Sequence, residues 1–304
     1  MSRLSVVIPT KDRAAALSHT LAGLGEQRTD GEFEVIVVDN GSGPRELEQA
    51  RRLVDALRIP AKLVEHPSGG PASARNAGVA AGGGAIVLLL GDDTDPADPK
   101  LVQAHVDLHS ARPEDTYAVL GRITWSPRSP VTPLMSWLEN GGPQFAYCDI
   151  SAGPVAPSKY FYSSHVSLKR AIFDRVGGFE PRFPDAAIED TDLGTRLGEA
   201  GLELDYHPEL LALHDHPTSL EQSLSRQVRV GRSAALYNEL RPDRPHPDIA
   251  RPVGWKWTAA QILSPAIEVA ARIPLPRAVQ ARLWLALHRQ RYAHGYRLGP
   301  PPAT

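Results

Sequence analysis

The sequence predicts an α/β fold: a mostly parallel, Rossmann-like sheet flanked by helices, followed by a C-terminal helical appendage. Short apolar runs without alternation indicate strands that are buried on both faces, and segments of helical period separate them. Acidic or turn-forming residues follow several of these runs. In open α/β sheets, ligands bind at the carboxyl ends of the strands. The 304 residues suffice for one large domain with an appendage.

The first part of the chain contains four predicted strands, at residues 4–8, 34–38, 61–64 and 85–90. Helices are expected after Thr10, which can cap the first of them, and across residues 47–57 and 73–80. A further helix is expected from Leu101 onwards, with Asp95 as its cap. This alternation predicts βαβ units with right-handed crossovers.

The later part is predicted to add strands at 118–121, 165–169 and 202–206, an apolar run at 210–213, and helices at 170–176 and 193–200. The segment between 122 and 162 is rich in prolines and aromatic residues. We expect it to form either a surface on which acceptor sugars stack or a separate packing cluster. Its aromatic residues include Trp125, Trp137, Tyr147, Tyr160 and Tyr162.

The composition is that of a globular protein, with 42% hydrophobic and 22% charged residues and a net charge of −2. This charge gives no reason to expect a nucleic-acid partner. A single cysteine, Cys148, excludes an internal disulfide and a cysteine-rich metal site. Neither a signal-peptide pattern nor an apolar run near the roughly 20 residues of a membrane span is visible, so we expect a cytoplasmic protein.

Carboxylates gather at the end of the fourth strand. Asp92, Asp93 and Asp95 suit a divalent cation that carries a phosphorylated ligand, although a helix cap is the simpler explanation. Asp39 closes the second strand, where it can bind a ribose or a base NH or form an Asx turn. Arg75 suits a diphosphate or a base edge, or is a solvated helix residue.

A second acidic group, Glu189, Asp190 and Asp192, opens a helix and suits its dipole. His214 and His216 lie two residues apart on an extended segment and therefore point the same way. They are ligand candidates only if they lie near Asp93. The first strand is followed by residues 9–13 without a Gly-rich or Walker-type loop, which argues against dinucleotide dehydrogenases and P-loop proteins.

In their order and spacing, these motifs resemble the family 2 glycosyltransferases of the GT-A fold, over roughly residues 4–235. The matching segments are Val6–Thr10 with Arg13, Val37–Ser42, Ala74–Gly78, Leu90–Asp93, Val176–Phe179, Glu189–Leu197, and His214 with His216. The resemblance implies a nucleotide-diphospho-sugar donor, Mn²⁺ or Mg²⁺ as cofactor, and inversion at the anomeric carbon.

The resemblance also assigns roles to residues. The donor-binding residues would be Pro9, Thr10, Arg13, Asp39, Arg75 and Asp92. Asp93 would bind the metal together with His214 or His216. Asp190 would be the general base, with Glu189 as the alternative. Two departures matter: Gly91 stands where the family commonly has Asp, and the Gln-x-x-Arg-Trp motif of processive synthases is absent, which favours single transfers.

We predict a nucleotide-sugar-binding and catalytic domain at residues 1–240 and a basic helical appendage at 241–304. From residue 251 onwards there are eight Lys or Arg and one acid, Glu268. One expected helix carries Trp255, Trp257, Ile262 and Leu263, and a second carries Val279, Leu283, Trp284 and Leu287. The appendage either contacts an anionic membrane surface peripherally or packs on the catalytic domain or in a homodimer.

The predicted function is therefore an inverting, metal-dependent glycosyltransferase that acts on a sugar, a lipid-linked or a small-molecule acceptor. A sugar-phosphate nucleotidyltransferase is one alternative, but it requires a Gly-rich basic first loop, which residues 10–13 supply poorly. A non-catalytic nucleotide-sugar-binding protein is the other.

Overall fold

The computed structural model describes residues 3–67, 69–244, 264 and 266–301. The chain divides into two compact units. The first contains residues 1–131 and 147–217, and the second contains residues 132–146 and 218–304. The boundary predicted after residue 240 coincides with the end of a helix of the second unit. The assignment of catalysis to residues 1–240 stays a prediction.

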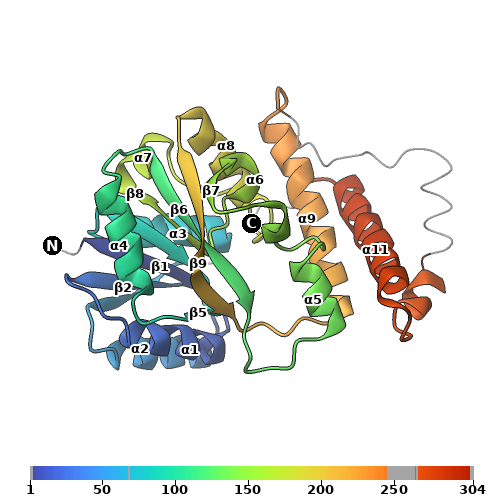
Figure 1. The fold of residues 1–304 in the computed structure, drawn as a ribbon, viewed down its shortest axis with the longest axis horizontal. Helices are drawn as coiled ribbons and strands as arrows, with labels where there is room; N and C mark the ends of the chain where they lie inside the picture. Colours follow the sequence, from blue (N-terminus) through green and yellow to red (C-terminus); the bar gives the residue numbers. More distant parts are fainter. Residues whose placement is uncertain (1–2, 68, 245–263, 265, 302–304) are drawn as a thin grey trace. The chain divides into compact units, whose positions relative to one another are not determined.

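The first unit is built on a nine-stranded sheet (Figure 1). Its strands are β1 (Leu4–Thr10), β2 (Phe33–Asp39), β3 (Ala61–Glu65), β4 (Ile86–Leu90), β5 (Thr94–Pro96), β6 (Tyr117–Trp125), β7 (Gly153–Val155), β8 (His165–Lys169) and β9 (Glu203–His214). The order is β3-β2-β1-β4-β8-β6-β9-β5, with β7 beside β9. Strands β3, β2, β1 and β4 are parallel, whereas β8 runs antiparallel to both β4 and β6.

Helices cover both faces of this sheet, which confirms the predicted fold class. They are α1 (Ala14–Gly25), α2 (Pro44–Asp55), α3 (Gly70–Ala81), α4 (Leu101–Ala111), α6 (Pro157–Tyr160), α7 (Arg170–Arg175) and α8 (Glu189–Glu199). Alternate residues of β1, such as Val6 and Ile8, share one core with α1, α2 and α4. Val7 points to the other face. There a Cβ on Gly78 would lie 2.4 Å from Val7 Cγ1, so glycine allows α3 to approach the sheet closely.

Two of the predicted helix caps are wrong. Helix α1 begins at Ala14, and Thr10 ends β1 with its hydroxyl donating to Asp92. Helix α4 begins at Leu101, whereas Asp95 lies in β5 and forms an ion pair with Arg128. In both cases the polar side chain bonds to a residue distant in sequence and does not cap a nearby helix.

The predicted strand at 202–206 and the apolar run at 210–213 belong to one strand, β9. Its pairing with β6 shifts register between Gly121 and Arg122, so a bulge accommodates the interruption. The three-residue strands β5 and β7 were not predicted. Both pair with β9, and such short segments carry too few residues to show a period.

Three buried histidines form a hydrogen-bonded chain between α4 and β8. The carbonyl of Arg122 only accepts, so His165 Nδ1 donates to it (3.2 Å), and His165 Nε2 must then accept from His105 Nε2 (3.1 Å). His105 Nδ1 in turn accepts from the Ser167 hydroxyl (2.8 Å), whose oxygen accepts from His109 Nε2 (2.9 Å). Every histidine is neutral in this arrangement and has one defined tautomer.

Within its described residues, the second unit contains helices α5 (Pro133–Glu139), α9 (Leu220–Leu240) and α11 (Arg277–Leu298). Glycines bring α9 and α11 together: a Cβ on Gly231 would lie 2.0 Å from the Tyr292 carbonyl oxygen. Ser223 Oγ contacts His288 Nε2 at 2.6 Å, and the His288 ring lies 5.0 Å from that of Trp137. This interface orders α5 against α11.

The aromatic residues between 122 and 162 mainly pack. Tyr147 stacks on Tyr206 and meets Tyr162 edge to face, and Tyr147 and Tyr160 are buried. Trp137 packs in the second unit. Tyr147, Tyr160 and Tyr162 are therefore packing residues of the first unit and not an exposed stacking surface.

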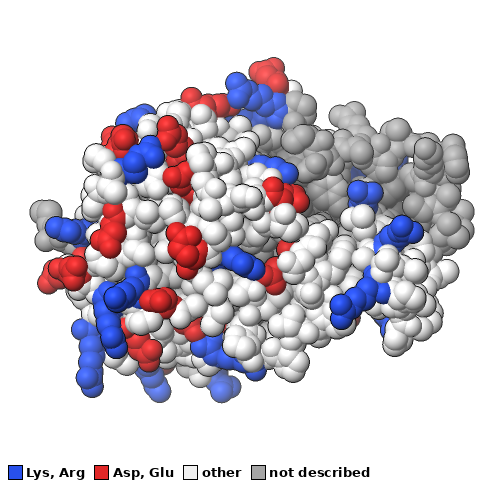
Figure 2. All heavy atoms as spheres, viewed as in Figure 1, with Lys and Arg blue, Asp and Glu red and all other residues white. Residues whose placement is uncertain are grey.

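The expected helix with Trp255, Trp257, Ile262 and Leu263 lies outside the described residues, while the expected helix around Val279 to Leu287 is the first half of α11. Among the described helices, none is both long and apolar enough to span a bilayer. Figure 2 shows acidic and basic side chains interspersed over the sheet unit. Such exposed pairs, for example Arg52 with Glu48, contribute roughly 0–1 kcal/mol each.

Candidate active site

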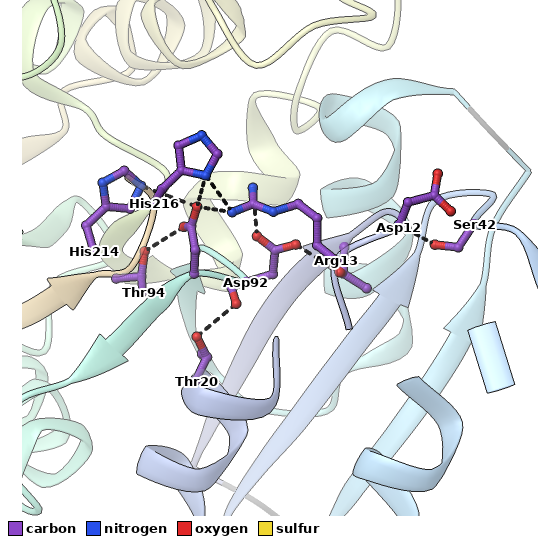
Figure 3. A network of polar contacts seen from close by, with 10 residues as sticks. Asp12, Arg13, Thr20, Ser42, Asp92, Thr94, His214 and His216 are labelled. Atoms are coloured by element: carbon purple, nitrogen blue, oxygen red, sulfur yellow. Dashed lines mark hydrogen bonds and ion pairs between the residues drawn. The ribbon is translucent and has the colours of Figure 1, made fainter. Parts of the chain in front are cut away.

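The carboxyl ends of β1, β2 and β4 bring the predicted donor-binding residues other than Arg75, together with Asp93, to one edge of the sheet. Thr10 and Asp39 are register partners at the ends of β1 and β2, and Asp92 and Asp93 follow β4. Pro9 pairs with Val38 one position earlier. Figure 3 shows that Arg13, from the start of α1, reaches across to both aspartates.

Asp92 is buried under β1 and α1. Thr10 Oγ1 donates to its Oδ2 (2.8 Å), Arg13 Nη1 lies 3.3 Å from its Oδ1, and the Thr20 hydroxyl donates to its carbonyl oxygen (3.0 Å). Burial and the adjacent Asp93 charge raise the pKa of Asp92 to about 7. Near neutral pH this residue is therefore only partly ionised.

Asp93 is the centre of the cluster. Its Oδ2 contacts Arg13 Nη2 and lies 3.3 Å from His214 Nε2 and 3.7 Å from His216 Nδ1. Burial alone would raise its pKa, but His214 and Arg13 hold the pKa of this carboxyl well below its usual range. The ring of Trp125 lies 5.1 Å from that of His214. The structure thus joins Asp93 to both histidines, as the histidine prediction requires.

This donor set fits a divalent cation in part. One carboxylate oxygen and two imidazoles converge, and Mn²⁺ accepts both ligand types. Within the described ranges, however, no group of three His, Cys, Asp or Glu residues is arranged as a complete metal site. A Mg²⁺-type site with one or two carboxylates takes its remaining ligands from substrate phosphates and water. The residues fit an ion that binds together with a phosphorylated ligand.

Asp39 combines the two roles considered for it. Its Oδ2 accepts hydrogen bonds from the backbone N–H groups of Gly41 (3.1 Å) and Ser42 (3.0 Å), which is an Asx turn. Its Oδ1 is buried, and no described residue provides it with a hydrogen-bond partner. An unpaired buried carboxylate oxygen is costly, so a ligand donor is the natural partner for it.

Arg75 and Glu189 form a buried ion pair. Arg75 Nη1 lies 3.0 Å from Glu189 Oε1, the guanidinium lies over the Phe179 ring, and the Ala187 N–H donates to Glu189 Oε2 (2.6 Å). Burial and the neighbouring Asp190 charge raise the pKa of Glu189 to about 7. Arg75 Nε is buried and unpaired among the described residues. The pair links α3 to α8, and both carboxylate oxygens of Glu189 already have partners in Arg75 and Ala187.

Asp190 has fewer hydrogen-bond partners than Glu189. Its Oδ2 accepts from the Ser163 N–H (2.9 Å), while its Oδ1 has no hydrogen-bond partner in the described part of the chain. The next carbonyl, that of Ser164, accepts from the Gly91 N–H (3.2 Å), directly before the first acidic cluster. Residues 163–164 therefore connect the two acidic clusters, although no contact joins Asp190 itself to Asp93.

Several residues of the site could not be identified from sequence. Arg128 neutralises Asp95 and lies 3.7 Å from Asp215. The Thr20 hydroxyl donates to the Asp92 carbonyl oxygen, and the Ser163 N–H donates to Asp190. None belongs to a short motif, because each reaches its partner only through the fold. The sequence shows Trp125 only as one of several aromatic residues and does not reveal its contact with His214.

Known proteins resemble this chain over more than half of its length. The model for glycosyl transferase family 2 matches residues 5–179. Validoxylamine A glucosyltransferase of Streptomyces hygroscopicus subsp. jinggangensis is 32% identical over 277 residues, or 84% of this chain and 64% of that protein. Pre-mycofactocin glycosyltransferase of Mycobacterium tuberculosis is 31% identical over 258 residues, or 80% of this chain and 49% of that protein. The chain thus spans less than two thirds of either relative.

Solved structures show the same fold. The mannosyltransferase PcManGT from Pyrobaculum calidifontis, in complex with GDP-Man and Mn²⁺, gives a TM-score of 0.61 at 20% identity, over 96% of this chain and 85% of that chain. S. aureus TarS 1-349 in complex with UDP gives 0.56 at 16%, over 98% and 92%. The predicted GT-A fold is thereby confirmed. From the matched family model and the relatives above 30% identity, the chain belongs to glycosyl transferase family 2, as its motifs predict.

Proposed function

We propose that this protein is an inverting, divalent-metal-dependent glycosyltransferase that moves a sugar from a nucleoside-diphosphate donor to an acceptor hydroxyl. The observation that carries the proposal is the convergence of Arg13, His214 and His216 on one oxygen of Asp93, at the carboxyl end of β4. Cationic and metal-binding groups at that edge suit a diphosphate.

The nucleoside half of the donor would lie towards β2. Asp39 Oδ1 is buried and lacks a hydrogen-bond partner among the described residues, so it can accept from a ribose hydroxyl or a base N–H. Asp92, held by Thr10, lies between this position and Asp93 and is the candidate for the ribose. The solved neighbours are complexes with GDP-Man and with UDP, which supports a nucleotide donor without deciding its base.

The metal would be held by Asp93 with His214 or His216. When bound, Mn²⁺ or Mg²⁺ supplies Lewis-acid neutralisation of the charge that develops on the leaving diphosphate. These side chains are themselves held in place, because the Asp215 N–H donates to the Asp93 carbonyl oxygen (2.8 Å) and the Trp125 ring lies against the His214 ring. The complex of PcManGT with Mn²⁺ is consistent with this proposal.

Asp190 would act as the general base. Its free Oδ1 can take the proton of the acceptor hydroxyl, whereas both oxygens of Glu189 are engaged with Arg75 and Ala187. One base with no second nucleophilic carboxylate corresponds to a single displacement, which inverts the anomeric centre. The acceptor would be a sugar, a lipid-linked or a small-molecule hydroxyl, and peripheral membrane contact or a homodimer through α11 stays a prediction.

The test is a transfer assay with a panel of UDP- and GDP-sugars and simple acceptors, in Mn²⁺ and in EDTA. Asp190→Asn should lower kcat by about 10²–10⁴-fold while the affinity for nucleoside diphosphate is retained. Asp174→Asn, an exposed carboxylate in α7, is the matched control and should transfer normally. NMR of the anomeric proton of the product should show inversion; retention would exclude a single displacement. Binding without transfer or hydrolysis of any donor would favour a non-catalytic protein.

A further inference from the structure

The Arg13 guanidinium provides a positive charge beside the carboxylates of Asp92 and Asp93. Its Nη2 contacts Asp93 Oδ2 and lies 3.1 Å from His216 Nδ1, while its Nη1 lies 3.3 Å from Asp92 Oδ1 (Figure 3). The oxygen that faces His214 and His216 is therefore the oxygen that the guanidinium holds. Because Arg stays protonated at all relevant pH values, it is a permanent positive charge at this point.

The backbone that carries Arg13 is firmly placed. Asp12 precedes it in the left-handed region with φ 52°, where its N–H donates to Ser42 Oγ (2.8 Å) and its carboxylate accepts from the Gly43 N–H (2.8 Å). The residue before the guanidinium is thus anchored to the turn after β2. Any change in the contacts of Arg13 must come from its side chain.

That side chain has room to move, whereas its carboxylate partners do not. The side chain of Arg13 is 35% exposed, against 8% for Asp92 and 11% for Asp93. Thr10 fixes the Asp92 carboxylate, and a backbone hydrogen bond from Asp215 fixes the main chain of Asp93. The guanidinium can rotate towards solvent while the carboxylates stay in place.

We propose that Arg13 is a resident cation that holds Asp93 until the donor arrives, so that a divalent metal binds well only together with a nucleoside diphosphate. The inference rests on the proposed metal-dependent function. A metal ion on Asp93 Oδ2 competes with Nη2 for the same lone pairs and is repelled by the guanidinium charge. A diphosphate reverses both effects, because its oxygens suit the planar guanidinium fork and draw Arg13 away from Asp93.

The consequence is a coupling between two ligands. If a nucleoside diphosphate raises the affinity for the metal by some factor, the metal raises the affinity for the nucleotide by the same factor. Arg13 is then a positioning residue that enforces joint binding. Without it, the metal should bind to the nucleotide-free protein directly.

Mn²⁺ binding, followed by the EPR signal of the free ion, tests this without any turnover. It is titrated into wild type, Arg13→Gln, Arg13→Lys and Arg128→Gln, first alone and then with saturating UDP or GDP. Arg13→Gln should bind Mn²⁺ alone at least about fivefold more tightly than wild type and show a smaller gain from the nucleotide. Arg13→Lys keeps the charge without the planar fork, so its affinity for nucleotide-free Mn²⁺ should stay closer to wild type than that of Arg13→Gln. A gain of Mn²⁺ affinity in Arg13→Gln cannot come from a loss of folding.

Arg128→Gln removes a similar charge from Asp95, which lies two residues after Asp93, and controls for net charge. Its nucleotide-free Mn²⁺ affinity should change less than that of Arg13→Gln. If Arg13→Gln binds Mn²⁺ alone no better than wild type, while UDP or GDP still promotes binding, the role of Arg13 is refuted and the proposed function stands. If no form binds Mn²⁺ with either nucleotide, the metal-dependent function fails and this inference fails with it.

Discussion

His109→Gln should reverse its effect on stability between pH 7 and pH 5. His109 Nε2 donates to Ser167, and its Nδ1 is buried without a partner among the described residues. A glutamine amide reaches the same position as Nε2 and keeps that donor. The substitution therefore preserves the hydrogen-bonded chain that ends at Arg122 but removes one group that titrates.

The magnitude follows from the pKa shift. Burial and the Lys169 charge lower the pKa of His109 to about 3, against about 6.5 in the unfolded chain. The unfolded state therefore binds a proton as the pH falls through 6.5, and the folded state does not, so stability is lost as the medium is acidified. Between pH 7 and pH 5 the loss is about 2 kcal/mol. His165, with its pKa lowered to about 4 mainly by burial, adds a similar loss in both proteins.

At pH 7 the variant should be less stable by about 1 kcal/mol, because the ring contact between His109 and Tyr117 is lost. At pH 5 it should be more stable than wild type by about 1 kcal/mol. Asp92 and Glu189 have pKa values raised to about 7, so their protonation increases the free energy of unfolding as the pH falls, equally in both proteins. The quantity to measure is therefore the difference in this free energy between the two proteins.

Native-state hydrogen exchange at β8 amides gives the free energy of unfolding of the sheet unit at each pH. His19→Gln, an exposed position in α1, is the matched control and should follow the wild-type curve. If the curves of wild type and His109→Gln run parallel from pH 7 to pH 5, the chain does not keep His109 neutral and the reasoning is wrong.

Gly231→Val should destabilise the second unit by about 1–3 kcal/mol, because even a Cβ collides with the α11 backbone; an unchanged melting temperature would contradict the close helix approach. Arg75→Gln should lower the free energy of unfolding by about 3–5 kcal/mol by leaving Glu189 buried and unpaired, whereas Arg51→Gln at an exposed pair should change it by about 0–1 kcal/mol in the same urea titration. Asp39→Asn should weaken UDP or GDP binding in calorimetry by about 10–100-fold without loss of folding; full affinity would remove Asp39 from the donor site.

The strands at the centre of the sheet were predictable because they are buried on both faces. The runs Val6–Ile8 and Ile86–Leu90 have no polar residue that would suggest another structure. Helix α9 was not predicted, although it has 21 residues. Its buried face is formed largely by small and polar residues, among them Gly231 and Ala234, because α11 approaches it closely. A helix that packs through small residues lacks the apolar stripe on which sequence analysis relies.

The predicted metal residues were identified correctly as neighbours, since Asp93, His214 and His216 meet at one oxygen. Their roles in catalysis stay predictions. What the sequence did not reveal is how each acidic group is neutralised. Arg128 reaches Asp95 from 33 residues away, and Arg75 reaches Glu189 from 114 residues away. Such pairs depend on the strand order, which no local motif encodes.

Arginine side chains of the protein itself are the counter-ions of two buried carboxylates in the candidate site. Asp93 is neutralised by Arg13 and Glu189 by Arg75, so the described site contains few free charges for a donor to meet. Burying carboxylates this deeply requires such partners, because an uncompensated buried charge is strongly destabilising. If the proposed donor and metal bind here, they would have to exchange partners with the protein instead of simply adding contacts. Asp39 differs, since its Oδ1 is buried with no hydrogen-bond partner among the described residues. On the proposed function, the nucleoside would bind first at β2 without breaking an ion pair, and its diphosphate would then draw Arg13 from Asp93.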